Sequence, residues 1–170
     1  MFVTVECEAA VIGCRGVRPE LDANLPCVLA LPGADHVLEA LPGDRWVLLS
    51  HHDDITTRNA LAAAELPAPA LVMVFPEDHL PDHYLEAAAS LHADPQVCLA
   101  IEDTAAGVAA AKSAGMQVIG VAATLEPIEL GAADFVVPSL LSVRVLGAHP
   151  FLVFEVDAIP EVGTQVARRR

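Results

Sequence analysis

The 170-residue sequence predicts an α/β protein whose parallel sheet is covered by helices on both faces. Short, almost continuously apolar runs recur along the chain, which is typical of strands buried on both sides. Between these runs lie longer segments whose apolar residues have helical spacing. Because strands and helices alternate, we expect a doubly wound (Rossmannoid) sheet with right-handed crossovers.

Six apolar runs are the expected strands of this sheet. They cover residues 9–14, 46–49, 70–75, 98–101, 118–121 and 134–137. The second run is followed directly by Ser50, and the fourth by the acidic residues Glu102 and Asp103. In open α/β sheets the carboxyl ends of the strands carry the ligand site, so these polar residues are candidate functional groups.

Four segments between the strands are the expected helices, at residues 34–41, 53–64, 81–91 and 104–114. The second begins at Asp53 or Asp54, either of which suits an N-terminal cap. The third begins with Pro81, which is favourable in a first helical turn. The fourth follows Thr104, another capping residue, and ends at Gly115.

The rest of the chain does not follow this alternation. Residues 18–30 contain two prolines and no clear period, which predicts a loop. Beyond residue 139 we expect a short helix and then a strand at 151–156, lying at a sheet edge within a C-terminal extension of residues 144–170. The length fits a single domain over residues 1–170.

Composition restricts the classes of partner. The formal charge of −14 at pH 7 argues against nucleic acids and anionic membranes, since both bind basic surfaces. No apolar run approaches the length of a membrane span, and no secretory signal begins the chain. The four cysteines show no metal-binding or disulfide spacing, so we expect reduced thiols in a cytoplasmic protein.

The segment around the acid pair resembles a known family. Glu102-Asp103-Thr104, then Gly107, then Ala-Ala-Lys-Ser-Ala-Gly-Met at 110–116, is similar to a motif of the haloacid dehalogenase (HAD) superfamily, as in its phosphoglycolate and sugar-phosphate phosphatases and β-phosphoglucomutases. Further similarity extends over residues 8–143 and includes the Pro-Asp-His-Tyr-Leu-Glu-Ala-Ala helix at 81–88. The resemblance implies a HAD-like fold. It also implies that residues 18–30 stand in place of the family's helical cap, so the domain is expected to be capless.

The resemblance also implies which positions carry the family's chemistry, and two motifs are degenerate. Gly13 and Arg15 stand where the family has its nucleophilic and its acidic aspartate, and Asp78 stands where it has a phosphate-binding lysine. A glycine cannot attack phosphorus, and an arginine cannot donate a proton at its usual pKa. Ser50 matches the family's phosphate-binding hydroxyl, although a turn cap is an equal alternative.

The acid pair matches the family's Mg²⁺ motif, so Glu102 and Asp103 are candidate metal ligands. Without a carboxylate at position 13 too few oxygen ligands remain, so we expect no cofactor, with Mg²⁺ as the less favoured possibility. Asp103 could instead pair with Arg15, which could also bind an anion. His51 and His52 form a second candidate, either for a transition metal or general base or simply for a polar loop.

These observations favour a degenerate HAD-like protein, a pseudoenzyme without aspartyl-phosphate phosphatase activity. It would act by binding a protein partner, a second copy of itself or an anionic small molecule. The alternative is an active HAD-type hydrolase or phosphatase that acts on a phosphorylated small molecule with relocated catalytic residues.

Overall fold

The computed structural model describes residues 1–14, 31–75, 80–160 and 162. Within them the predicted α/β fold is confirmed, with all six expected strands in one parallel sheet of order β4-β3-β2-β5-β6-β7. The strands are β2 (Ala9–Cys14), β3 (Trp46–Ser50), β4 (Leu71–Val74), β5 (Cys98–Glu102), β6 (Gln117–Val121) and β7 (Phe135–Val137).

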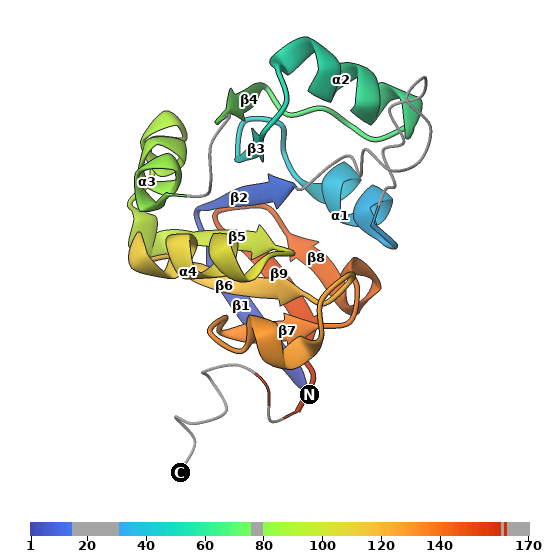
Figure 1. Cartoon of the computed structure of the whole chain (residues 1–170), viewed down its shortest axis with the longest axis vertical. Coiled ribbons are helices and arrows are strands. Elements are labelled where there is room, and N and C mark those ends of the chain that lie inside the picture. The colour runs from blue at the N-terminus through green and yellow to red at the C-terminus, as the bar shows by residue number, and fades with distance from the viewer. Residues whose placement is uncertain (15–30, 76–79, 161, 163–170) are drawn as a thin grey trace.

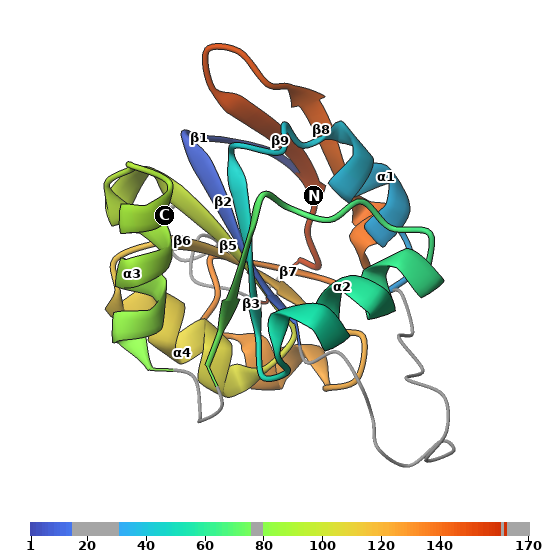
Figure 2. The same ribbon diagram turned by 90° about the horizontal axis from the view of Figure 1, so that it is seen from above.

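Helices cover both faces of this sheet (Figures 1 and 2). On one face lie α1 (Ala34–Ala40) and α2 (Asp54–Ala63), and on the other lie α3 (Pro81–Ser90) and α4 (Ala105–Ser113). The buried side chains form two clusters, one on each side of the sheet. In the part of the chain that the structure describes, three short 3₁₀ turns complete the helical segments, at Pro95–Val97, Pro127–Leu130 and Leu140–Ser142.

Local side-chain chemistry fixes the helix ends much as the sequence predicts. The Asp53 side chain accepts the backbone N–H of Thr56 at 2.9 Å and begins α2. The Thr104 hydroxyl accepts the backbone N–H of Gly107 at 3.0 Å and begins α4. After α4, Gly115 has φ of +89°, a left-handed conformation that favours glycine at the end of a helix.

A second sheet was not anticipated. It is antiparallel, with order β1-β9-β8, and consists of β1 (Phe2–Cys7), β8 (Val143–Gly147) and β9 (Leu152–Asp157). The strand expected near residues 151–156 forms as β9, but its predicted edge position is wrong because it pairs with strands on both sides. The short helix expected after residue 139 is only one 3₁₀ turn, and β8 follows it directly.

The inner side chains of this second sheet belong to the same cluster as α1. Val5, Leu152 and Phe154 are buried together with Trp46 and Leu99 of the parallel sheet. The small sheet therefore covers, with α1 and α2, the face where a conventional doubly wound protein would place more helices. Within the described part of the chain, no helix is both long and apolar enough to cross a lipid bilayer.

Candidate functional site at the carboxyl ends of the strands

Strand register brings three of the candidate residues to one edge of the parallel sheet. Gly13 pairs with Leu49 in β3, one residue before Ser50. On the other side Ile12 pairs with Ile101 in β5, one residue before Glu102. Gly13, Ser50 and Glu102 therefore stand at the carboxyl ends of adjacent central strands, where ligands bind in open α/β sheets.

Glu102 is the most deeply buried acidic residue of this edge, with 1% of its surface exposed. The hydroxyl of Tyr84, which projects from α3, donates to Glu102 Oε1 at 2.6 Å. The other carboxyl oxygen, Oε2, is buried and has no hydrogen-bond partner among the described residues. The nearby Thr104 hydroxyl is engaged with the Gly107 N–H. Tyr84 thus holds the carboxyl group through Oε1.

Two glycines make room for this carboxyl group. A Cβ atom placed on Gly13 would lie 1.5 Å from Glu102 Oε1, and one placed on Gly107 would lie 2.0 Å from Oε2. Both distances are far shorter than any non-bonded contact, so neither position tolerates a side chain while Glu102 keeps this conformation. The Glu102 carboxyl therefore occupies the space that a side chain at position 13 would need.

Burial also decides the protonation state of Glu102. The pKa of the Glu102 carboxyl is raised to about 8, mainly because burial removes it from water; the Tyr84 hydrogen bond lowers this pKa, and the neighbouring Asp103 carboxyl raises it. At neutral pH Glu102 is therefore mostly a neutral acid. Burial is likewise the main reason why the pKa of the Tyr84 hydroxyl is raised, with the Glu102 carboxyl as the second cause.

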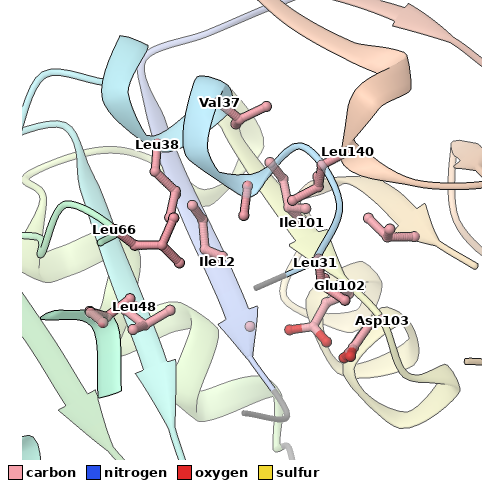
Figure 3. Close-up of a pocket in the computed structure, with 14 residues that line it drawn as sticks. Ile12, Leu31, Val37, Leu38, Leu48, Leu66, Ile101, Glu102, Asp103 and Leu140 are labelled. Carbon is pink, nitrogen blue, oxygen red and sulfur yellow. The ribbon is translucent and has the colours of Figure 1, made fainter. Parts of the chain in front are cut away.

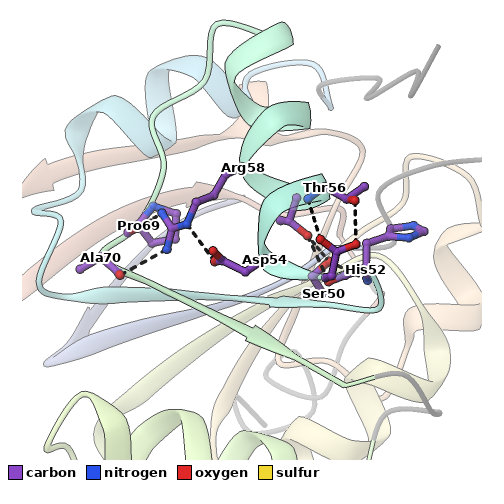
Figure 4. A network of polar contacts seen from close by, with 9 residues as sticks. Ser50, His52, Asp54, Thr56, Arg58, Pro69 and Ala70 are labelled. Carbon is purple, nitrogen blue, oxygen red and sulfur yellow. Dashed lines mark hydrogen bonds and ion pairs between the residues drawn. The ribbon is translucent and has the colours of Figure 1, made fainter.

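Ser50 lies at the predicted strand end, but its hydroxyl takes part in the turn that leads into α2. It is buried, lies 2.8 Å from the Thr57 hydroxyl and accepts the backbone N–H of His52 at 3.1 Å. Thr57 in turn donates to the His52 carbonyl oxygen at 3.3 Å. This network, shown in Figure 4, is the arrangement expected of a turn cap, one of the two roles proposed for Ser50.

The polar cluster after Ser50 does not assemble as a metal site. Asp53 caps α2, and hydrogen bonds from Thr56 lower the pKa of its carboxyl. Asp54 forms an ion pair with Arg58 at 2.8 Å, and the imidazole of His52 points away from the capping contacts (Figure 4). Over residues 1–14, 31–75, 80–160 and 162, no three His, Cys, Asp or Glu side chains are placed to hold a metal ion.

Asp103, the residue that follows β5, is buried like Glu102. Asp103 is 8% exposed, and its carboxyl lies beside that of Glu102 in Figure 3. The predicted pairing of Asp103 with Arg15 stays a prediction, because Arg15 lies outside the described residues. Asp78 and the loop predicted at 18–30 lie outside them as well.

The described donors do not fit a magnesium ion of the kind that the resemblance implies. Position 13 supplies no side-chain oxygen, and Glu102 is a protonated acid bonded to Tyr84. A hard dication requires several ionised or carbonyl oxygens around it. Of the predicted acid pair, Asp103 alone remains as a candidate ligand among the described residues.

Two residues of this site were not predicted as functional. Tyr84 and Gly107 both belong to the segments that carry the family resemblance, but no role was assigned to either. Their link to Glu102 depends on the packing of α3 and α4 against β5. A tyrosine at a core position of a helix was the available signal, since a buried Tyr hydroxyl usually has a hydrogen-bond partner.

Comparison with known proteins gives a consistent family assignment. The family model described as haloacid dehalogenase-like hydrolase matches residues 17–115, which is more than half of the chain. A bifunctional riboflavin kinase/FMN phosphatase of Arabidopsis thaliana is 31% identical over 153 residues, covering 84% of this chain and 40% of that protein. Hexitol phosphatase A of Escherichia coli is 34% identical over 127 residues, covering 69% of this chain and 57% of that protein.

A solved structure agrees with these matches. A HAD family hydrolase of Deinococcus radiodurans, crystallised with phosphate and sodium, superposes with a TM-score of 0.54 at 27% identity, over 64% of this chain and 55% of that one. The predicted HAD-like fold is thereby confirmed. The chain spans between about two fifths and three fifths of the length of these relatives.

Proposed function

The chain belongs to the haloacid dehalogenase-like hydrolase family, and we propose that it acts by binding a partner or a small ligand, without an aspartyl-phosphate reaction. One observation carries this proposal. The Glu102 carboxyl fills the space above Gly13, so position 13 has no nucleophile, and none fits there while Glu102 keeps this conformation. A neutral acid hydrogen-bonded to Tyr84 is also a poor nucleophile and a poor metal ligand.

The expected partners follow from the same site. A protein partner, a second copy of the chain and an anionic small molecule all remain proposals. The anionic ligand depends on Arg15, because the described residues that line the cavity beside Glu102 contribute acids and apolar groups. We also propose a capless domain and a cytoplasmic location, the latter supported by the free thiols of the buried Cys7 and Cys98.

A phosphatase assay tests the proposal directly. The purified chain is incubated with p-nitrophenyl phosphate and a panel of sugar phosphates in the presence of Mg²⁺, with E. coli hexitol phosphatase A as the positive control. We expect no turnover above background. Turnover that is lost in Asp103→Asn but kept in Asp54→Asn, a change at an exposed carboxyl outside the site, would overturn the proposal.

The second candidate is an active hydrolase for phosphorylated small molecules with relocated catalytic groups. The names of the relatives favour it, since both curated relatives described above are phosphatases. Its chemistry would have to come from Asp103, Glu102 and Ser50. The same assay separates the two candidates, because only the second requires turnover that depends on Asp103.

A further inference from the structure

A separate pocket lies at the amino ends of the strands, away from the acid pair. It is lined by residues 8–9 at the start of β2, 44–45 before β3, 91–93 after α3 and 150–151 before β9. Its volume of about 440 Å³ is within the range of small-molecule sites. At roughly 3.3 Å per strand residue, the start of β2 is about 13 Å from Gly13, so this pocket is distinct from the site described above.

The turn that joins β8 to β9 holds the guanidinium of Arg45 at the wall of this pocket. Nη1 of Arg45 donates to the Pro150 carbonyl oxygen at 2.7 Å and to that of Ala148 at 3.5 Å. Pro150 also lines the pocket, so the first bond keeps the guanidinium beside it. Among the described residues, Nε and Nη2 have no hydrogen-bond acceptor. These two nitrogens can therefore bind a carboxylate through two parallel hydrogen bonds.

The same pocket contains charges of the opposite sign. Glu8 and Asp44 line it and are exposed, and in the described part of the chain no ion pair joins either carboxyl to Arg45. His92 is the remaining polar residue of the lining. A simple anion at Arg45 would be repelled by the two carboxylates, and a simple cation would be repelled by Arg45. A ligand that carries both charges avoids both repulsions.

Apolar groups complete the lining of the pocket. Phe151 is 44% exposed, and Leu91, Ala9 and Ala93 are the other apolar residues that line it. Ligand sites typically combine aromatic and aliphatic walls with a few convergent polar groups. An exposed aromatic ring also offers a flat surface to an apolar part of a ligand. The lining therefore favours a ligand that has an apolar part beside its two charges.

We infer that this pocket binds a free α-amino acid with an apolar side chain. Its carboxylate lies on Nε and Nη2 of Arg45, and its ammonium group lies beside Glu8 and Asp44. Its side chain packs against Phe151. The inference goes beyond the proposed function and does not depend on it, because the two sites lie at opposite ends of the parallel strands.

Four ligands test the inference: L-phenylalanine, 3-phenylpropionate, which lacks the ammonium group, 2-phenylethylamine, which lacks the carboxylate, and glycine, which lacks the side chain. Each is titrated into the full chain and followed by ¹H–¹⁵N NMR. We expect saturable shifts with L-phenylalanine at residues 8–9, 44–45, 91–93 and 151, with a dissociation constant on the order of millimolar. The other three should bind at least about tenfold more weakly.

An arginine variant tests the contact with the carboxylate. Arg45→Lys keeps the positive charge but cannot form two parallel hydrogen bonds, so it should weaken L-phenylalanine binding about tenfold. Arg144→Lys makes the same change at an exposed position of β8 outside the pocket and should leave the affinity unchanged. The buried Trp46 reports by its fluorescence that both variants are folded.

A double variant tests the acidic side of the pocket. Glu8→Gln with Asp44→Asn should weaken L-phenylalanine about tenfold and strengthen 3-phenylpropionate, because the repulsion of the anion is removed. Glu6→Gln with Glu39→Gln gives the same change in net charge at exposed positions outside the pocket, and both affinities should stay as in the wild type. A loss of fold does not explain an anion that binds more tightly.

Three results would overturn the inference. The first is no saturable shift with L-phenylalanine, or shifts that lie outside the pocket. The second is an affinity for 3-phenylpropionate, 2-phenylethylamine or glycine equal to that for L-phenylalanine. The third is equal affinity for L-phenylalanine in the wild type, Arg45→Lys and the double variant at Glu8 and Asp44. Phosphatase turnover would overturn the proposed function alone and would leave these titrations unaffected.

Discussion

Replacement of Glu102 by glutamine gives the sharpest test of the site, because it removes one titration and keeps the shape of the side chain. In the unfolded chain the Glu102 carboxyl ionises at its ordinary pKa of 4.5, whereas in the folded protein it keeps its proton up to about pH 8. Between these values the folded state binds more protons than the unfolded state. The free energy of unfolding therefore falls as the pH rises.

The size of the effect follows from the same two values. Each pH unit within the window costs up to about 1.4 kcal/mol, which sums to about 3 kcal/mol by pH 7 and about 4 kcal/mol by pH 8, where half of the folded-state carboxyl is ionised. Glu102→Gln abolishes this dependence at all pH values. The new amide group lies close to Gly107 and adds an offset, but that offset does not vary with pH. The difference in slope between the two proteins therefore isolates Glu102.

Urea denaturation at pH 5, 6, 7 and 8 measures the slope. The single tryptophan, Trp46, is buried and reports unfolding by its fluorescence. We expect wild type to lose up to about 1.4 kcal/mol per pH unit relative to Glu102→Gln over this range. Glu39→Gln, at an exposed position of α1, is the control and should keep the wild-type slope. If the free energy of unfolding changed with pH equally in wild type and in Glu102→Gln, the conclusion that Glu102 is a buried, protonated acid would be refuted.

Two further substitutions probe the surroundings of this carboxyl, both measured by the same urea denaturation. Tyr84→Phe removes the 2.6 Å hydrogen bond and should destabilise the fold by about 1–2 kcal/mol, while moving the Glu102 titration to still higher pH. An unchanged stability would contradict that role. Gly13→Ala must expel the Glu102 carboxyl and should cost on the order of 2–4 kcal/mol. Gly43→Ala, where a new Cβ meets nothing within 4 Å, should change stability by less than about 0.5 kcal/mol, and equal costs at the two glycines would argue against the packing described here.

The parallel sheet and its helices could be predicted because each element has a strong local signal. Buried strands are continuous apolar runs, and Asp53, Thr104 and Gly115 mark helix ends by side-chain and backbone chemistry that acts within a few residues. The second sheet lacks such signals. In β1 only Val5 and Cys7 are buried. The partners of β9 are β1, which lies more than a hundred residues earlier in the chain, and β8, which lies about ten residues earlier. Pairing of that kind depends on the finished fold.

The sequence predicts the strand ends at which the candidate residues lie, but not the conformation or the protonation of their side chains. The sequence places Gly13, Ser50 and Glu102 at strand ends, since a parallel sheet brings such ends together. It contains no local sign that Glu102 turns toward Gly13 or that Tyr84 and Gly107 enclose it, because these contacts join four different elements. The protonation of Glu102 depends on its complete burial and is likewise a property of the folded chain.

Gly13 and Glu102 are best understood as one structural unit. Considered alone, a glycine at position 13 is the loss of a side chain. In the folded protein it is also a packing requirement, because the Glu102 carboxyl would lie 1.5 Å from any Cβ there. An aspartate at position 13 would thus have to displace a buried acid that Tyr84 holds in place. A change at position 13 therefore recreates the catalytic arrangement that the family resemblance implies only if the Glu102 side chain also turns away, since both carboxyl groups cannot occupy that space.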